Sequence, residues 1–261
     1  MSFSRREFLA SSGLGLAATA GAQDALRLAQ ATRGGRTLIK GGVVLTMDRA
    51  LGDFERADVL IDGARIAAVG PNLAASSATV IDAAGMIVMP GFIDTHHHQY
   101  ETLLRGILAD GILLGPRSYM SDIQGILTPP YAPEDAYISE LVASLSQINA
   151  GVTTGVDTSQ VSHSPQHTDA CIQGLKEAGR RTVFAYSPGA GAKAQYPQDI
   201  RRLRKQYFSS ADQLMTLALA GTIDPGEWAL AREVGASISV HAFGSLSNVA
   251  KVLGPDVTYI H

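Results

Sequence analysis

From Pro90 onward, short apolar runs of strand character alternate with longer stretches of helical character, and this alternation constrains the fold more than any other feature. The expected strands lie at residues 92–98, 153–157, 182–186, 215–220, 237–241 and 257–261. The expected helices lie between them, at residues 133–149, 165–179, 199–208, 225–235 and 246–253. Prolines open three of the helices, and glycines follow the ends of several. The alternation predicts an α/β architecture with a parallel sheet.

Residues 37–89 have a different character, because short β-type runs follow one another with turn signals between them. These signals are Gly41-Gly42, Asp62-Gly63 and Gly70-Pro71. Asp62-Gly63, between two apolar runs, is typical of a tight hairpin. We therefore expect residues 37–89 to form part of a small β-sandwich domain in front of the α/β region at residues 90–261.

The first 22 residues have the pattern of a bacterial export signal. Arg5-Arg6 precedes a mildly apolar stretch, and Ala20-Gly21-Ala22 offers a cleavage site. We expect a twin-arginine signal peptide at residues 1–22, recognised by the twin-arginine export machinery, and a linker at residues 23–36. The mature protein would then be periplasmic or secreted. The alternative is a chance Arg-Arg pair in front of an amphipathic helix.

The composition is ordinary for a globular protein, since 46% of the 261 residues are hydrophobic and the formal net charge is −3. No basic excess indicates nucleic-acid binding, and no apolar run is long enough to span a membrane. The one cysteine, Cys171, excludes an intrachain disulfide and is expected to be a buried structural thiol. The sequence leaves the oligomeric state open.

The expected strand at residues 92–98 ends in three consecutive histidines after Asp94 and Thr95. Side chains alternate along an extended strand, so His96 and His98 should point to one face and His97 to the other. Two imidazoles on one face can bind one divalent cation, because neutral histidine nitrogen suits zinc and similar metals. The alternative for an isolated His-x-His is a solvated polar strand end.

The run P-G-F-I-D-T-H-x-H after a glycine-rich β region resembles the first barrel strand of the amidohydrolase superfamily. The triple histidine with Gln99-Tyr100 and Leu103-Leu104-Arg105 is similar to its cytosine deaminase and triazine-hydrolase branch. The resemblance extends from about Leu38 to His261. It implies a metal-dependent hydrolase with a partial (β/α)8 TIM barrel of about six strands and a small N-terminal β-sandwich. In the family, strands from the C-terminal end complete that sandwich.

The resemblance also implies a metal site, because barrel enzymes place their chemistry at the C-terminal ends of the strands. It assigns His96, His98 and His241 as metal ligands. His261 corresponds to a histidine that orients the substrate or stabilises developing charge. Binuclear members use a modified lysine on the fourth strand, which residues 215–220 lack. We therefore expect one divalent metal ion, zinc in the first place and iron as the alternative, that lowers the pKa of a bound water to around 7.

Two departures from the family pattern bear on the activity. The branch that deaminates or dechlorinates rings has H-x-x-E at the strand-5 histidine, and Gly244 stands at the glutamate position here. The sequence also stops at His261, so it contains neither strands 7 and 8 nor the strand-8 aspartate that binds metal and acts as general base. We expect a fragment of a longer polypeptide, with a truncated product as the alternative.

Three further residues follow strand ends and are expected to bind substrate: Gln99, His163 and Tyr186. Asp157 is expected as polar lining of the same mouth. The function expected is hydrolysis of a non-peptide C–N bond in a small molecule, such as a cyclic amide, an amidine or an amino-heterocycle. The alternatives are an aromatic-ring deaminase or dechlorinase, and a catalytically inactive metal-binding remnant.

Overall fold

The computed structural model describes residues 35–74, 76–108, 112–242 and 244–260. The chain divides into two compact units between Pro90 and Gly91, and each unit is described by itself. The expected signal peptide, residues 1–22, and most of the expected linker lie outside the described residues, as does His261.

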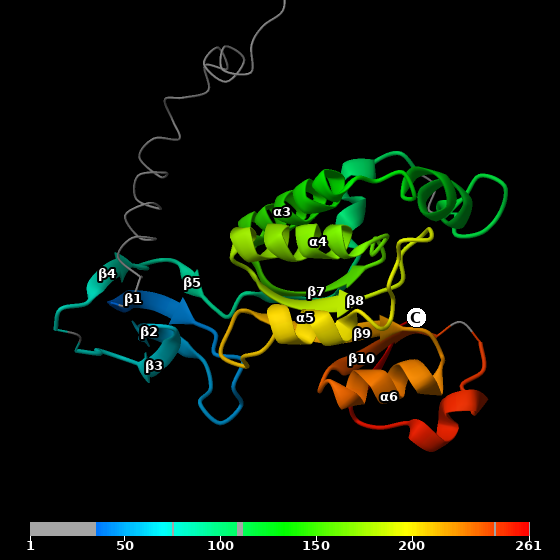
Figure 1. The fold of residues 1–261 in the computed structure, drawn as a ribbon. Helices are drawn as coiled ribbons and strands as arrows, with labels where there is room; N and C mark the ends of the chain where they lie inside the picture. The colour runs from blue at the N-terminus through cyan, green and yellow to red at the C-terminus, as the bar shows by residue number, and fades with distance from the viewer. Residues whose placement is uncertain (1–34, 75, 109–111, 243, 261) are drawn as a thin grey trace, which may run out of the picture. The chain divides into compact units, whose positions relative to one another are not determined.

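The first unit contains a five-stranded sheet. Its strands are β1 (Arg36–Val44), β2 (Phe54–Asp62), β3 (Arg65–Gly70), β4 (Thr79–Asp82) and β5 (Ile87–Val88). Strands β1, β2 and β3 pair antiparallel, and β4 and β5 both pair parallel with β1 (Figure 1). Gly63 has a φ of 59° in the tight β2–β3 connection, which explains the Asp62-Gly63 hairpin signal. The described strands of this unit form one sheet, so the second layer of a sandwich stays a prediction.

The second unit contains a six-stranded parallel sheet that curls into a half-barrel (Figure 1). The strands pair in chain order: β6 (Phe92–His97), β7 (Val152–Ser159), β8 (Arg181–Tyr186), β9 (Met215–Gly221), β10 (Ser237–His241) and β11 (Val257–Ile260). The predicted fold class, an α/β chain with a partial (β/α)8 barrel, is confirmed. A Cβ on Gly91 would lie 2.2 Å from the Thr153 Oγ1 atom, so only glycine allows β6 to start this close to β7.

Helices follow the strands and lie around the outside of the curled sheet (Figure 1). They are α3 (Pro133–Asn149), α4 (Pro165–Ala178), α5 (Ile200–Gln206), α6 (Pro225–Glu233) and the 3-10 helix η3 (Ser247–Val252). Proline occupies the first turn of α3, α4 and α6, where a backbone N–H is not needed. α4 ends at Gly179 with a φ of 72°, the left-handed conformation that glycine adopts without strain. The described helices include none long and apolar enough to cross a membrane.

The strands of the half-barrel have a bulky outer face and a small inner face. Phe184, Leu219 and Ile238 are buried in one cluster with residues of the helices, such as Leu175 and Trp228. A separate cluster contains the alanines at alternate strand positions, Ala185, Ala218 and Ala220. Alternation therefore directs large side chains to the helices and leaves room on the opposite face of the sheet. Cys171 on α4 is a buried free thiol, as expected.

The segment between β6 and α3 contains two irregular helices. These are the 3-10 helix η1 (Gln99–Leu104) and the π-helix η2 (Tyr119–Leu127). Ser118 caps η2, because its hydroxyl oxygen accepts a hydrogen bond from the Ser121 backbone N–H.

Candidate metal centre and cavity

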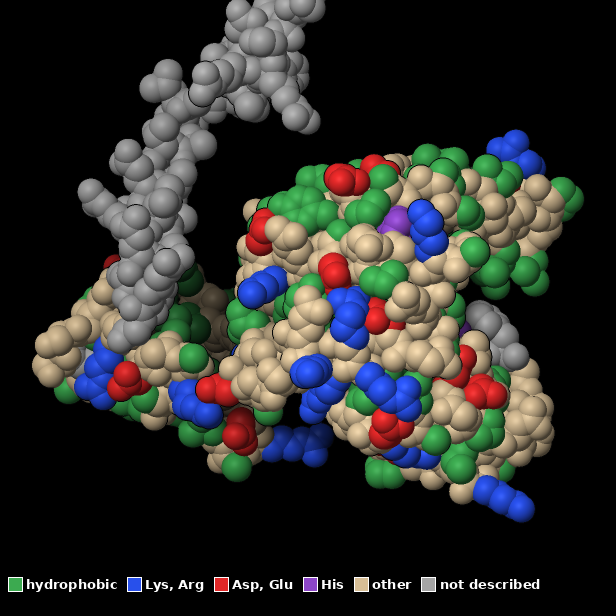
Figure 2. All heavy atoms as spheres, viewed as in Figure 1, with side chains coloured by type: hydrophobic (Ala, Val, Ile, Leu, Met, Phe, Trp, Pro, Cys, Tyr) green, Lys and Arg blue, Asp and Glu red, His purple; other side chains and the backbone are tan. Residues whose placement is uncertain are grey.

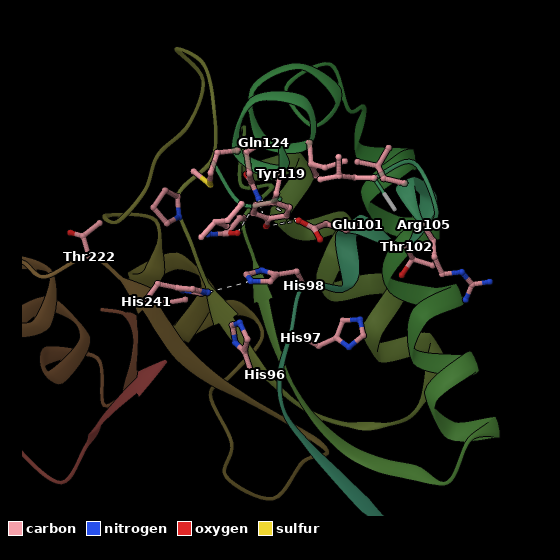
Figure 3. Close-up of a pocket in the computed structure, with 18 of the residues that line it drawn as sticks. His96, His97, His98, Glu101, Thr102, Arg105, Tyr119, Gln124, Thr222 and His241 are labelled. Atoms are coloured by element: carbon pink, nitrogen blue, oxygen red, sulfur yellow. Dashed lines mark hydrogen bonds between the residues drawn. The ribbon is translucent and has the colours of Figure 1, made fainter. Parts of the chain in front are cut away.

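Three imidazoles converge at the C-terminal ends of two strands that lie far apart in the sequence. His96 belongs to β6, His98 follows it directly, and His241 is the last residue of β10. One ring nitrogen from each lies within 4.8 Å of the others (Figure 3). The His98 and His241 Nε2 atoms are 3.3 Å apart.

Hydrogen bonding fixes the tautomer of His98. Its Nδ1–H donates to the Thr158 backbone carbonyl at 3.0 Å, so the lone pair is on Nε2, the atom that faces His241. Burial, with a contribution from His96, lowers the pKa of His98 to about 3, which keeps the ring neutral. A neutral imidazole with a free lone pair is the form that binds a metal ion.

His97 is turned away from these three rings, as the strand period predicts (Figure 3). Its Nδ1 lies 2.9 Å from the Asp94 Oδ2 atom and 2.7 Å from the Gln147 Nε2 atom. The group His96, His98 and His241 could therefore hold a metal ion, and its three neutral nitrogen donors suit zinc and neighbouring divalent metals.

The three histidines line a cavity of about 950 Å³. Much of its wall comes from η1, η2 and the segment between them, including Glu101, Arg105, Tyr119 and Gln124 (Figure 3). The Glu101 carboxylate accepts hydrogen bonds from the Tyr119 hydroxyl at 2.7 Å and the Tyr100 hydroxyl at 2.9 Å. Sequence reasoning missed Glu101 and Tyr119, although Glu101 is only three residues beyond the histidine motif.

The three residues predicted to bind substrate are not among the described residues that line this cavity. Gln99 is buried, where its Nε2 donates to the Glu140 Oε2 atom at 3.2 Å. Tyr186 is buried against the Tyr196 ring, with ring centroids 5.3 Å apart. His163 lines a separate cavity of about 220 Å³. Their assignment as substrate-binding residues stays a prediction.

Both ring nitrogens of the buried His163 are hydrogen-bonded. The Ala190 backbone N–H donates to His163 Nδ1 at 2.7 Å, and His163 Nε2–H donates to the Thr128 carbonyl at 3.0 Å. The ring thereby joins the end of η2 to the loop after β8.

Asp157 is fully buried and does not line the large cavity, so its expected place in the mouth is wrong. It occupies a β7 position that faces the helices, where its Oδ1 accepts from the Gln99 backbone N–H at 3.2 Å. Burial raises the pKa of Asp157 to about 6. Burial and the neighbouring Asp157 raise the pKa of Glu140 on α3 well above its usual range.

Comparison with known proteins places these features in a wider group. A sequence model of the amidohydrolase family matches residues 87–252. The chain is 38% identical over 122 residues to the 5'-deoxyadenosine deaminase of Methanosarcina mazei, which covers 46% of this chain and 27% of that protein. It is 27% identical over 230 residues to the 5-methylthioadenosine/S-adenosylhomocysteine deaminase of Pelotomaculum thermopropionicum, covering 82% of this chain and 51% of that protein.

A solved structure gives a similar result. A mutant of the atrazine chlorohydrolase of Arthrobacter aurescens TC1, complexed with zinc and atraton, superposes with a TM-score of 0.67 at 25% identity. The match covers 80% of this chain and 53% of the chlorohydrolase. The chain thus spans about half of the length of these proteins, or less.

Proposed function

The chain belongs to the amidohydrolase family, and from this membership we propose that it carries the metal centre of a mononuclear hydrolase of non-peptide C–N bonds. The substrate class is a small cyclic amide, an amidine or an amino-heterocycle. The observation that carries the proposal is the convergence of His96, His98 and His241 beside a cavity large enough for such a molecule.

In this proposal His96, His98 and His241 hold one zinc ion. Strand β9, Met215–Gly221, carries no lysine that would bridge a second metal. A bound divalent cation supplies Lewis acidity and lowers the pKa of a coordinated water to about 7. Thr158 keeps the His98 ring in the tautomer that presents Nε2.

The other residues of the cavity bind and orient the substrate. Leu104, Leu113 and Ile223 line it with apolar surface that displaces water from a flat ring. His261 is proposed to steady the charge that develops at the scissile carbon. It lies outside the described residues, so this role rests on the family resemblance.

Turnover by the zinc-loaded protein tests the proposal. A panel of cyclic amides, amidines and amino-heterocycles should contain compounds that are hydrolysed, and His98→Ala should abolish both zinc retention and turnover. His97→Gln is the matched control for zinc retention, because that ring faces away. Undiminished turnover in His98→Ala would contradict the proposal. Zinc retention without any turnover would favour the inactive metal-binding remnant.

A second candidate is an aromatic-ring deaminase or dechlorinase. The names of the similar proteins favour it, since they include a 5'-deoxyadenosine deaminase and an atrazine chlorohydrolase. Against it, Gly244 stands where that branch has a glutamate that moves protons. Release of ammonia from an intact ring of the same panel, or of chloride from a chlorinated heterocycle added to it, would select this candidate over ring opening.

We also propose export through the twin-arginine pathway, on the strength of Arg5-Arg6 and the small residues at Ala20–Ala22. The conservative double substitution R5K/R6K should hold the protein in the cytoplasm of a bacterial host. Equal periplasmic amounts of the variant and the original protein would contradict this proposal.

A further inference from the structure

Glu101 is the carboxyl group of the cavity. Among the described residues that line it, no other aspartate or glutamate is present. Glu101 belongs to η1, one turn beyond the end of β6, so it lies on the same mouth as the candidate metal ligands (Figure 3). The family resemblance implies a glutamate at position 244, but this sequence has Gly244 there, which carries no acidic group.

The carboxylate of Glu101 is held firmly through one of its two oxygens. Oε1 accepts hydrogen bonds from the Tyr100 and Tyr119 hydroxyls at 2.9 and 2.7 Å. Gln124 Nε2 approaches the same oxygen at 3.4 Å and donates to the Tyr119 hydroxyl at 2.8 Å. These donors belong to η1 and η2, so their hydrogen bonds to the carboxylate connect the two helices that line the cavity.

The second oxygen, Oε2, has a different environment. Within the described part of the chain no hydrogen bond to Oε2 and no ion pair to Glu101 is found, and the residue is only half-buried. Burial raises the pKa of Glu101, which means that its charge is poorly solvated. A carboxylate in that situation gains from a further N–H or O–H donor.

We propose that Glu101 selects the substrate, by accepting through Oε2 a hydrogen bond from an N–H donor on an amidine or amino-substituted ring. This deepens the proposed function, because the donor belongs to the molecule that reacts at the metal centre. The two tyrosine hydroxyls hold the acceptor in place before the substrate arrives, which reduces the entropy lost on binding.

Equilibrium binding of two flat probes tests this without requiring turnover. Benzamidinium presents several N–H donors, and acetophenone has the same number of non-hydrogen atoms in a similar shape without any such donor. Zinc-loaded protein should bind benzamidinium more tightly than acetophenone. In Glu101→Gln the amide oxygen can still accept from the tyrosines, but the charge is gone, so this preference should fall by roughly tenfold or more. Glu134→Gln, an exposed site on α3, is the matched control and should keep the preference.

A second variant separates contact from charge. Glu101→Asp keeps the charge but withdraws it by one methylene, so direct contact predicts that the preference falls here too. An unchanged preference in either Glu101 variant overturns the proposal, as does an equal loss in Glu134→Gln. If no compound is turned over but the preference depends on Glu101, the proposed hydrolysis fails while this recognition stands.

Discussion

Thr158 supports two of the three candidate metal ligands at once. Its backbone carbonyl accepts from His98 Nδ1–H at 3.0 Å, and its Oγ1 lies 3.4 Å from His96 Nδ1. The residue is fully buried on β7, so both contacts are shielded from water. Groups that orient metal-binding imidazoles from behind contribute measurably to metal affinity.

The side-chain contact can be removed without disturbing the backbone contact. Thr158→Val keeps the shape and the carbonyl but loses Oγ1, so zinc affinity should fall by about tenfold. Competition with a chromophoric chelator measures this. Thr216→Val, an exposed threonine on β9, should leave zinc affinity unchanged. An unaltered affinity in Thr158→Val would show that Oγ1 does not support the site.

The strand period made part of this site predictable from the sequence. The opposed directions of His96 and His97 follow from alternation, which is a local property of any strand. Glu101 and Tyr119 were not predicted, because their contact depends on how η1 and η2 pack together. Asp157 was expected at the mouth, yet its side chain faces the helices, since one residue of shift along β7 reverses the face.

At the scale of elements, a cluster of buried polar side chains connects α3 to β7 on the side of the sheet that faces the helices. Glu140 of α3 accepts from Gln99, and Asp157 of β7 accepts from the Gln99 backbone N–H. Arg180, also buried, lies close enough to favour the charged forms of both acids. Even so, burial dominates and raises the pKa of both carboxyls.

These shifts predict how stability depends on pH. An acid whose pKa is higher in the folded than in the unfolded state binds its proton more tightly in the folded protein. The folded state is therefore more stable at low pH, and its free energy of unfolding falls as the pH rises. For Asp157, with a folded pKa of about 6, the loss occurs between about pH 4 and pH 6.

Removing one acid should reduce this dependence. In Glu140→Gln the free energy of unfolding, measured by urea titration, should fall less between pH 4 and pH 7 than in the original protein. Glu134→Gln should leave the difference unchanged, because that side chain is exposed. A variant whose pH dependence equals that of the original protein would contradict the account of this pair.

Most of the regular elements match the sequence-based boundaries within a few residues. α3 spans Pro133–Asn149 as predicted, since proline and the following glycine mark its ends. The predicted helix at 246–253 is instead the 3-10 helix Ser247–Val252, where serine and asparagine favour turns over a regular helix. The π-helix η2 had no periodic signal, because its geometry does not follow the 3.6-residue period.

At the scale of the half-barrel unit, apolar side chains are exposed on the helix α3 and on the first strand, β6. Figure 2 shows hydrophobic side chains over α3, where Ile138, Val142 and Leu145 form a stripe at helical spacing. Phe92 and Ile93 on β6 are 59% and 67% exposed, and within the described residues β6 pairs only with β7. Exposed apolar surface beside an open strand edge favours association.

The 261-residue chain should therefore self-associate when it is produced alone. Replacing Val142 and Leu145 together by lysine, which is compatible with a helix, should reduce the light-scattering mass of the protein at a given concentration. Lysine at Arg201 and Arg204, two positions on α5, provides a control with the same number of substitutions. Equal association in all three proteins would exclude the α3 stripe as a contact surface.

The central claim is that His96, His98 and His241 together bind one metal ion. X-ray absorption spectroscopy on the zinc-loaded protein, with the metal content measured on the same sample, tests it most directly. We predict one zinc per chain with three imidazole nitrogens at about 2.0–2.1 Å, and loss of that signal in His241→Ala. Two zinc ions per chain, or an unchanged spectrum in His241→Ala, would contradict the claim.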